Sequence, residues 1–175
     1  MAPSLVQTIK DSVRTIPDFP KKGILFRDIT PLLMDPAAFR SCIDHFASLT
    51  KKKVDSVISI ESRGFILGSA LAYALGAGFV PIRKEGKLPH KKFKTSYELE
   101  YGEAVVEIHA DAVHPGSHVV LIDDVLATGG TMKAAIELVS KFGAEVSGIY
   151  FLIELEALGG RKKLAPYPVH SLVSY

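Results

Sequence analysis

The chain has 175 residues, of which 47% are hydrophobic and 23% are charged, and its formal net charge at pH 7 is +2. This length and composition are typical of one globular domain with a substantial core. A charge so close to neutral does not favour a nucleic-acid partner, and no apolar run reaches the roughly 18 residues of a membrane span. The one cysteine, Cys42, excludes an internal disulfide and is typical of a reducing compartment, so we expect a cytoplasmic protein.

The N-terminal part of the chain predicts two helices with a turn-rich segment between them. Ser4 can cap a first helix with apolar residues at helical spacing, and Pro17 is expected to close it. A short apolar stretch at 24–26 is interpreted as a strand. Asp35 and Pro36 form a good N-cap and first-turn pair for the second helix, which extends to about residue 49 and contains the cysteine.

The middle of the chain alternates between strand and helix patterns. Residues 54–60 predict a strand, and the sequence ESRG follows it directly. A helix is expected over 65–75, with Gly76 as its stop signal. Residues 79–82 predict the next strand.

The segment 83–102 is longer than an ordinary connection. It is first basic and then polar and aromatic, with little sustained periodicity. Long loops in compact domains are usually functional lids or disordered segments. We interpret this segment as a lid, with an antiparallel ribbon between 96–101 and 104–108.

The stretch HVVLIDDVLATGGTMKAA, residues 118–135, is the most informative part of the sequence. It predicts a strand at 119–122, then Asp123 and Asp124, then a turn of small residues and a helix. Two glycines allow the backbone to approach a ligand, and the helix N-terminus adds a positive dipole end. The pattern indicates a sugar-phosphate site, with amides for the phosphate and carboxylates for the diol. An ordinary strand-turn-helix connection is the alternative.

The order of the elements predicts the fold class. The helix after this stretch is expected to end near residue 142, and further strands are expected at 146–153 and 169–173. Repeated strand-helix-strand units with right-handed crossovers give an α/β protein with a doubly wound, mostly parallel sheet and helices on both faces. Ligands of such sheets bind at the carboxyl ends of the strands. This rule places three segments on one rim: 61–64, 83–87 and 123–131.

Several motifs in one order resemble a known family. The sequence VVLIDDVLATGGT is similar to the phosphoribosyl-diphosphate signature of the type I phosphoribosyltransferases. Further segments resemble the adenine-using members: PDFPKKGILFRDITPLL, ESRGF, IRKEGKLP, SYELEYG and GGRKKLAPYPVHSL. The resemblance implies the type I phosphoribosyltransferase fold in a single domain over 1–175, with a small N-terminal hood at about 1–34 and a flexible antiparallel lid at about 84–107. It also implies a homodimer.

The resemblance implies a reaction in which adenine and 5-phosphoribosyl-1-diphosphate (PRPP) give AMP and pyrophosphate, a step of purine salvage. Positive charge then develops on the ribose and negative charge on the leaving group, so a protein helps most by neutralising the leaving group and holding the sugar. Magnesium is the implied cofactor, because it is hard and commonly bridges substrate phosphates. We expect the substrate diphosphate to carry it near Asp123 and Asp124, with no dedicated protein ligand.

The resemblance also implies which residues are catalytic. Asp123 and Asp124 match acids that contact the ribose hydroxyls, and Arg63 matches the arginine of the pyrophosphate loop. Glu100 is expected to help move the purine proton. Tyr101 is expected to help close the lid over the substrates, which would exclude water from a reactive ribosyl cation.

Three further groups of binding residues follow from the same resemblance. The loop for the 5-phosphate is expected to consist of Ala127, Thr128, Gly129, Gly130 and Thr131. The pyrophosphate is expected to contact Ser62, Arg63, Arg83, Lys84 and Lys87. Because adjacent strand residues face opposite ways, Arg83 and Lys84 are expected to point to different sides of the strand, and Glu85 lowers the local positive charge.

The hood is expected to recognise the base. Leu25 and Arg27 match positions whose backbone groups read the adenine edge, and Phe26 matches an aromatic residue that packs against the ring. From the sequence pattern alone, Phe26 would be interpreted as a core residue.

Two other functions remain open at this point. A related transferase could use hypoxanthine, guanine or xanthine, although the hood sequence FPKKGILFRD favours adenine. A PRPP-sensing regulator could bind nucleic acid, but the charge is nearly neutral and only a short helix precedes the hood. A zinc site is not expected, because Pro115 and Gly116 predict a turn between His114 and His118. The expected partners are therefore small molecules, without nucleic acid or membrane.

Overall fold

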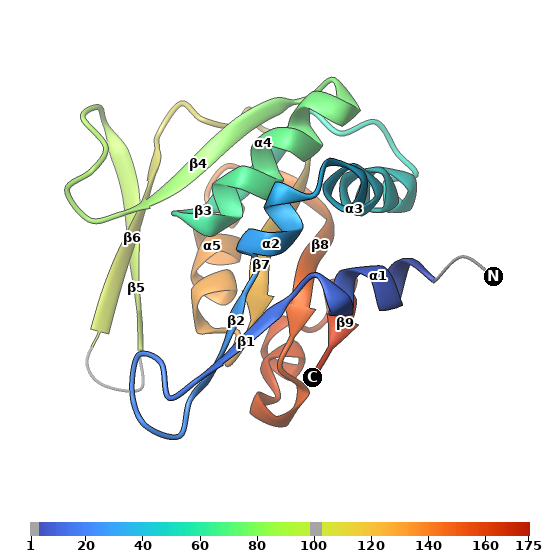
Figure 1. Cartoon of the computed structure of the whole chain (residues 1–175). Coiled ribbons are helices and arrows are strands. Elements are labelled where there is room, and N and C mark those ends of the chain that lie inside the picture. Colours follow the sequence, from blue (N-terminus) through green and yellow to red (C-terminus); the bar gives the residue numbers. More distant parts are fainter. Residues whose placement is uncertain (1–3, 99–102) are drawn as a thin grey trace.

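The computed structural model describes residues 4–98 and 103–175. Within them, a seven-stranded sheet forms the centre of the molecule, with the strand order β5-β6-β4-β3-β7-β8-β9 (Figure 1). The parallel part of the sheet consists of β4 (Gly78–Lys84), β3 (Ser56–Ile60), β7 (His118–Leu126), β8 (Glu145–Glu154) and β9 (Val169–Ser174). Two antiparallel strands extend one edge, β6 (Glu103–His109) and β5 (Lys92–Glu98). The predicted mostly parallel α/β sheet is confirmed.

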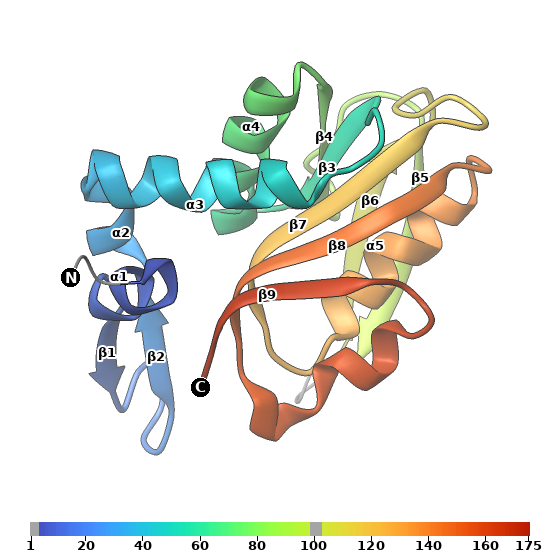
Figure 2. The same ribbon diagram turned by 90° about the vertical axis from the view of Figure 1, so that its right-hand side faces the viewer.

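Helices cover both faces of the sheet, as predicted. One face carries α3 (Pro36–Leu49) and α4 (Arg63–Leu75), and the opposite face carries α5 (Gly130–Ser140) (Figure 2). Successive residues of β7 alternate between the two sides. Val120 and Ile122 pack in the core with α3 and α4, whereas Val119 and Leu121 pack in the core with α5. Because both faces are covered, the strand is apolar without interruption from Val119 to Ile122.

The predicted caps of two helices are present. The side chain of Asp35 accepts hydrogen bonds from the backbone N–H groups of Ala37 and Ala38 at the start of α3. Gly76 ends α4 in the left-handed conformation, with φ +63°. Cys42 is buried within α3, and burial raises the pKa of its thiol to about 12. This thiol is therefore poorly suited to act as a nucleophile.

The hood differs in detail from the expectation. The first helix, α1 (Leu5–Asp11), has Ser4 as its N-cap, but it ends before Ser12 and Pro17 does not close it. Instead, the strand β1 (Arg14–Pro17) pairs antiparallel with β2 (Leu25–Asp28), and a short helix, α2 (Thr30–Met34), follows. These elements are too short for a periodic pattern, and the two strands pair only with each other. No helix among residues 4–98 and 103–175 is long and apolar enough to cross a membrane.

Two strands extend further than predicted. β7 continues to Leu126, so Asp123 and Asp124 lie within the strand and not after it, because the ladder with β8 continues through both acids. The ribbon at the sheet edge pairs Lys92 with His109 and Glu98 with Glu103, and so begins four residues before the predicted start at 96. Backbone hydrogen bonds hold β5 and β6 together. Because β5 is mostly polar, its sequence has no apolar pattern that would mark where the strand begins.

Candidate active site

The carboxyl ends of three parallel strands surround one cavity. Its volume is about 420 Å³. The residues that line it come from the ends of β3, β4 and β7, from the turn after β7 and from the edge ribbon: Ile60, Glu61, Ser62, Arg63, Lys84, Tyr97, Val106, Asp123, Asp124, Val125, Ala127 and Thr131. The structure thus brings together residues from all three segments that the sequence places on one rim. This is the position at which doubly wound sheets bind their ligands.

Two adjacent carboxyl groups form the floor of this cavity. Asp124 is 5% exposed, and Oδ1 of Asp123 accepts a hydrogen bond from the backbone N–H of Asp124 at 2.9 Å. Burial raises the pKa of both groups, and the neighbouring charge of Asp124 raises the pKa of Asp123 further. Keeping both groups ionised is therefore costly in the free protein. Hydroxyl donors or a cation placed between the two carboxylates would reduce that cost.

Arg63 connects the acid pair to the hood. Its Nε lies 2.7 Å from Oδ2 of Asp124, and this charge opposes the rise in the pKa of that carboxyl. The guanidinium carbon also lies 5.0 Å from the centre of the Phe26 ring. Phe26 is half-buried, packs edge-on against Phe19 at 5.1 Å and belongs to neither apolar core. The interpretation of Phe26 as a core residue is therefore wrong.

Gly64 permits the close approach of α4 to the acids. A Cβ atom at this position would lie 2.6 Å from Oδ1 of Asp123 and 2.8 Å from Oγ of Ser59. Distances below 3 Å would force one of the groups to move. The glycine of the ESRGF motif thus lets the first turn of α4, with its positive dipole end, rest against the carboxylates.

The predicted pyrophosphate cations have a carboxylate partner that sequence reasoning missed. Glu61, whose side chain is 5% exposed, accepts hydrogen bonds from Arg83 Nε at 2.8 Å and from Lys87 Nζ at 2.6 Å. Burial alone would raise the pKa of Glu61, but the hydrogen bonds from Lys87 and Arg83 outweigh it and lower that pKa. The only feature of the sequence that could have indicated this partner was an acidic residue directly before Ser62. A cis peptide bond joins Glu61 to Ser62.

The other two charged residues at this corner face different ways. Lys84 lines the cavity, whereas Glu85 pairs with Lys94 of β5 at 3.2 Å and is not among the lining residues. The structure therefore keeps Glu85 away from the acid pair. Of the three predicted cations at 83–87, Arg83 and Lys87 contact Glu61, and Lys84 does not. Strand alternation explains why Lys84 and Arg83 have different surroundings.

The residues predicted for the 5-phosphate form the connection between β7 and α5. Gly129 has φ +78°, a left-handed conformation that favours glycine. A hollow of about 70 Å³ lies against this loop and also touches Asp123. Four of the five predicted residues line the hollow: Ala127, Thr128, Gly129 and Thr131. Gly130 is the first residue of α5.

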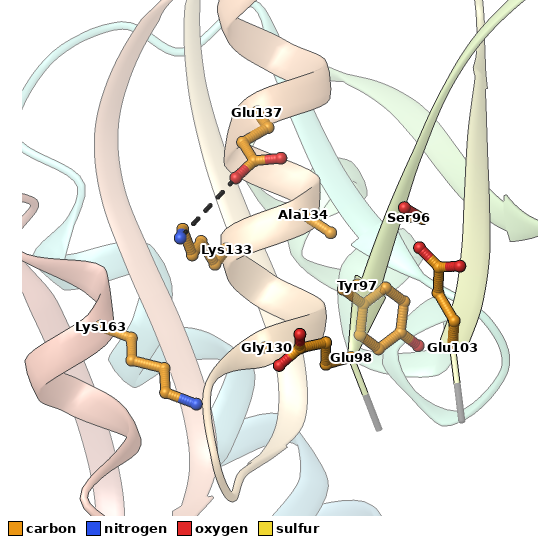
Figure 3. A pocket seen from close by; sticks show the side chains of 9 residues that line it. All are labelled: Ser96, Tyr97, Glu98, Glu103, Gly130, Lys133, Ala134, Glu137 and Lys163. Carbon is orange, nitrogen blue, oxygen red and sulfur yellow. Dashed lines mark ion pairs between the residues drawn. The ribbon is translucent and has the colours of Figure 1, made fainter. Parts of the chain in front are cut away.

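The edge ribbon lies beside this loop. A second cavity, of about 510 Å³, is lined by residues of β5, β6 and α5, with Glu98, Lys133 and Lys163 among its side chains (Figure 3). The middle of β5 is attached to α5, because Thr95 donates a hydrogen bond to Glu137 at 3.2 Å. Glu100 and Tyr101, predicted for proton transfer and lid closure, lie outside the described residues.

The hood residues predicted for the base lie at the boundary between the hood and the sheet. Leu25 is 54% exposed. The guanidinium carbon of Arg27 lies 3.7 Å from the centre of the Tyr175 ring, and Arg27 is not among the residues that line the cavity.

Comparison with known proteins identifies the relatives of this chain. Residues 30–171 match the phosphoribosyl transferase domain family. An adenine phosphoribosyltransferase of Carboxydothermus hydrogenoformans is 56% identical over 171 residues, which cover 95% of this chain and 99% of the relative.

Solved structures show the same similarity. The adenine phosphoribosyltransferase of Thermoanaerobacter pseudethanolicus superposes with a TM-score of 0.94 at 51% identity, over 97% of this chain and 99% of the other. The enzyme of Saccharomyces cerevisiae, solved with adenine and an imino-altritol bisphosphate, gives 0.91 at 43% identity, over 96% of this chain and 98% of the other.

Proposed function

The chain belongs to the phosphoribosyl transferase family, and we propose that it transfers the phosphoribosyl group of PRPP to adenine, giving AMP and pyrophosphate. One structural observation supports this proposal independently of the similarity to known proteins. Arg63 contacts Asp124 of the acid pair on one side and Phe26 of the hood on the other. A sugar held by the acids and a base held by the hood would therefore meet at Arg63.

In bond cleavage, the acid pair acts on the ribose and the cations act on the diphosphate. Asp123 and Asp124 accept hydrogen bonds from the ribose hydroxyls and favour the positive charge that develops on the ribose. Arg63 and Lys84 neutralise the diphosphate as it leaves, with Ser62 beside them. Arg83 and Lys87 are held by Glu61 in the free protein, so a diphosphate has to share them with that carboxylate. The loop 127–131 holds the 5-phosphate through its backbone amides and threonine hydroxyls.

Magnesium is the cofactor of the proposed reaction. The adjacent carboxylates of Asp123 and Asp124 fit a hard cation that is bound mainly by substrate phosphates, because such sites use one or two protein carboxylates. When bound with the diphosphate, magnesium neutralises negative charge on the leaving group. Burial and the neighbouring charge of Asp124 raise the pKa of Asp123, and a cation beside the pair would favour its ionised form.

The hood selects the base and the lid protects the reaction. The backbone groups of Leu25 and Arg27 read the adenine edge, and Phe26 packs against the ring. Glu100 takes part in moving the purine proton, and Tyr101 closes the lid over the substrates. Hood, sheet and lid act as one domain, with the hood at about 1–34 and the lid at about 84–107.

The functional unit is proposed to be a homodimer in the cytoplasm. A groove of about 820 Å³ runs between α3 and α4, and two of the large apolar side chains that line it are exposed, Ile66 at 42% and Tyr73 at 91%. A second copy of the chain would cover this face through a two-fold interface. Sedimentation at micromolar concentration should give the dimer mass, and Tyr73→Glu should shift the population toward monomer.

A product assay tests the proposed reaction. Purified protein, adenine, PRPP and magnesium should give AMP and pyrophosphate in equal amounts, and chelation of the magnesium should stop their formation. Folded protein that forms no AMP under these conditions contradicts the proposal. Steeply salt-dependent binding to DNA or RNA in its place would favour the regulator.

A further inference from the structure

The loop predicted for the 5-phosphate rests against a distant glycine. A Cβ atom at Gly160 would lie 2.2 Å from the carbonyl oxygen of Ala127 and 2.9 Å from the backbone nitrogen of Gly129. In the other direction, a Cβ atom at Gly129 would lie 2.6 Å from the carbonyl oxygen of Gly160. The atoms on both sides belong to backbone, so neither side can yield by a change of rotamer. Two glycine backbones are therefore in direct contact where a side chain on either would separate them.

The residue after Gly160 is fixed to the sheet. Arg161 forms a two-pronged ion pair with Glu154, in which its Nε donates at 3.0 Å and its Nη2 also donates. Nη1 donates to the carbonyl oxygen of Val169 at 2.6 Å, and Nη2 also donates to Oγ of Ser171 at 3.1 Å. Hydrogen bonding from Arg161 lowers the pKa of Glu154, whose side chain is 8% exposed. This guanidinium thus attaches the segment to the carboxyl end of β8 and to the first half of β9.

The same carboxyl end of β8 also fixes the beginning of the loop. Leu126, directly before Ala127, pairs with Glu154, and its carbonyl oxygen accepts a hydrogen bond from the N–H of Leu155 at 2.9 Å. The loop and the segment that presses on it therefore share one anchor. Segment 156–164 runs beside the loop at the end of the sheet where β7 and β8 finish (Figure 2).

We propose that Gly160 and Arg161 form a brace that holds the 5-phosphate loop in its binding conformation, with Gly160 as the positioning residue and the Arg161–Glu154 pair as its anchor. The proposal rests on the function proposed for the loop 127–131. Gly160 touches no substrate in this account. It sets the positions of Ala127 and Gly129, whose backbone would otherwise be free to relax toward segment 160–164.

Gly160→Ala tests the brace. The added methyl group would displace the carbonyl of Ala127 and the amide of Gly129, and a shift of about 1 Å in a binding loop can cost about 100-fold. We expect the dissociation constant for ribose 5-phosphate, measured by calorimetry, to rise by about 10- to 100-fold, and the KM for PRPP to rise with it. The KM for adenine should change by less than about twofold, because the hood lies away from the brace.

Gly159→Asn is the matched control. Gly159 has φ +63°, which asparagine tolerates, and no atom lies within 4 Å of a Cβ atom built there. This neighbouring change should leave ribose 5-phosphate binding unaltered. Glu154→Gln loosens the anchor without adding an atom, and it should weaken ribose 5-phosphate binding in the same direction as Gly160→Ala but by less. It therefore tests the brace even if the alanine variant does not fold.

The outcomes separate the brace from the proposed function. If the wild-type protein binds ribose 5-phosphate and makes AMP, but Gly160→Ala and Glu154→Gln bind ribose 5-phosphate as tightly as the wild type, the brace is wrong and the function stands. Equal losses for PRPP and adenine would also overturn it, because they would indicate general damage to the fold. A wild-type protein that neither binds ribose 5-phosphate nor forms AMP contradicts the function itself.

Discussion

Arg63 Nε lies 2.7 Å from Oδ2 of Asp124, and this ion pair joins the first turn of α4 to the end of β7. It connects the two halves of the proposed site, because the same guanidinium lies over the ring of Phe26. The pair does not fully compensate the buried acids, since the pKa of Asp124 stays raised beside Arg63 and the pKa of Asp123 is raised well above its ordinary value of 3.8. Ionising both carboxyls is therefore costly in the free protein, and hydroxyl donors or a cation from the substrate would reduce that cost.

Asp123→Asn should abolish most activity and stabilise the fold near neutral pH. The amide removes a buried charge next to Asp124, but it cannot accept hydroxyl hydrogen bonds as strongly. The folded-state pKa of Asp123 is raised, so its ionisation destabilises the fold only above the ordinary value of 3.8. The gain in unfolding midpoint over wild type should thus be small at about pH 3.5 and increase toward pH 7.

Thermal unfolding across this pH range, together with turnover at pH 7, checks the prediction. Ser59→Ala is a suitable control, because it changes a buried neighbour of the site without changing charge. A variant that loses stability at pH 7 while turning over normally would identify Asp123 as a structural residue.

Phe26→Leu should weaken adenine use selectively. The substitution keeps an apolar side chain but removes the flat ring, which contributes about 0.5–1.5 kcal/mol to stacking beyond its area. We expect the KM for adenine to rise by about 3- to 10-fold while the KM for PRPP stays near its wild-type value. Steady-state kinetics with each substrate varied in turn gives both numbers. Phe93→Leu in β5, whose ring packs against Phe142, should change neither KM; an equal effect of both substitutions would count against adenine stacking on Phe26.

Glu61→Gln should make pyrophosphate a stronger product inhibitor. In the free protein Glu61 holds Arg83 and Lys87, and a neutral amide would hold them less tightly, so both cations become available to the diphosphate. The inhibition constant for pyrophosphate should fall by about 10-fold, which corresponds to about 1.4 kcal/mol.

Glu85→Gln makes the same change of charge outside the cavity, where Glu85 pairs with Lys94. Product-inhibition kinetics of both variants separates a local from a general effect of charge. If the two substitutions shift the inhibition constant equally, only the overall charge matters and the pairing with Glu61 has no specific role.

The sequence predicted those parts of the fold whose signals are local. Asp35 and Gly76 mark helix ends through hydrogen bonding and backbone conformation that neighbouring residues determine. The acids and glycines of 123–131 were found for the same reason, since one strand-turn-helix unit contains them all. The rim was predicted because the order of parallel strands fixes where their carboxyl ends meet.

The missed features depend on residues that are far apart in the sequence. Glu61 meets Arg83 and Lys87 only because β3 and β4 are adjacent in the sheet, and no local pattern marks that pairing. Gly160 was noticed only within a motif of the tail, since its contact with Ala127 follows from packing of backbones over 30 residues apart. The strand β1 has four residues and no apolar alternation, so pairing with β2 determined its conformation.

Competition between bases tests the central claim most directly. A single mixture of protein, magnesium and limiting PRPP with equal concentrations of adenine, hypoxanthine and guanine reports the ratio of kcat/KM values from the nucleotides formed. A site that hydrogen-bonds the adenine edge should reject a base with the wrong edge by about 10⁴-fold, so AMP should account for essentially all product. Comparable yields of IMP or GMP would contradict adenine recognition by the hood, and an absence of any nucleotide would contradict the transferase itself.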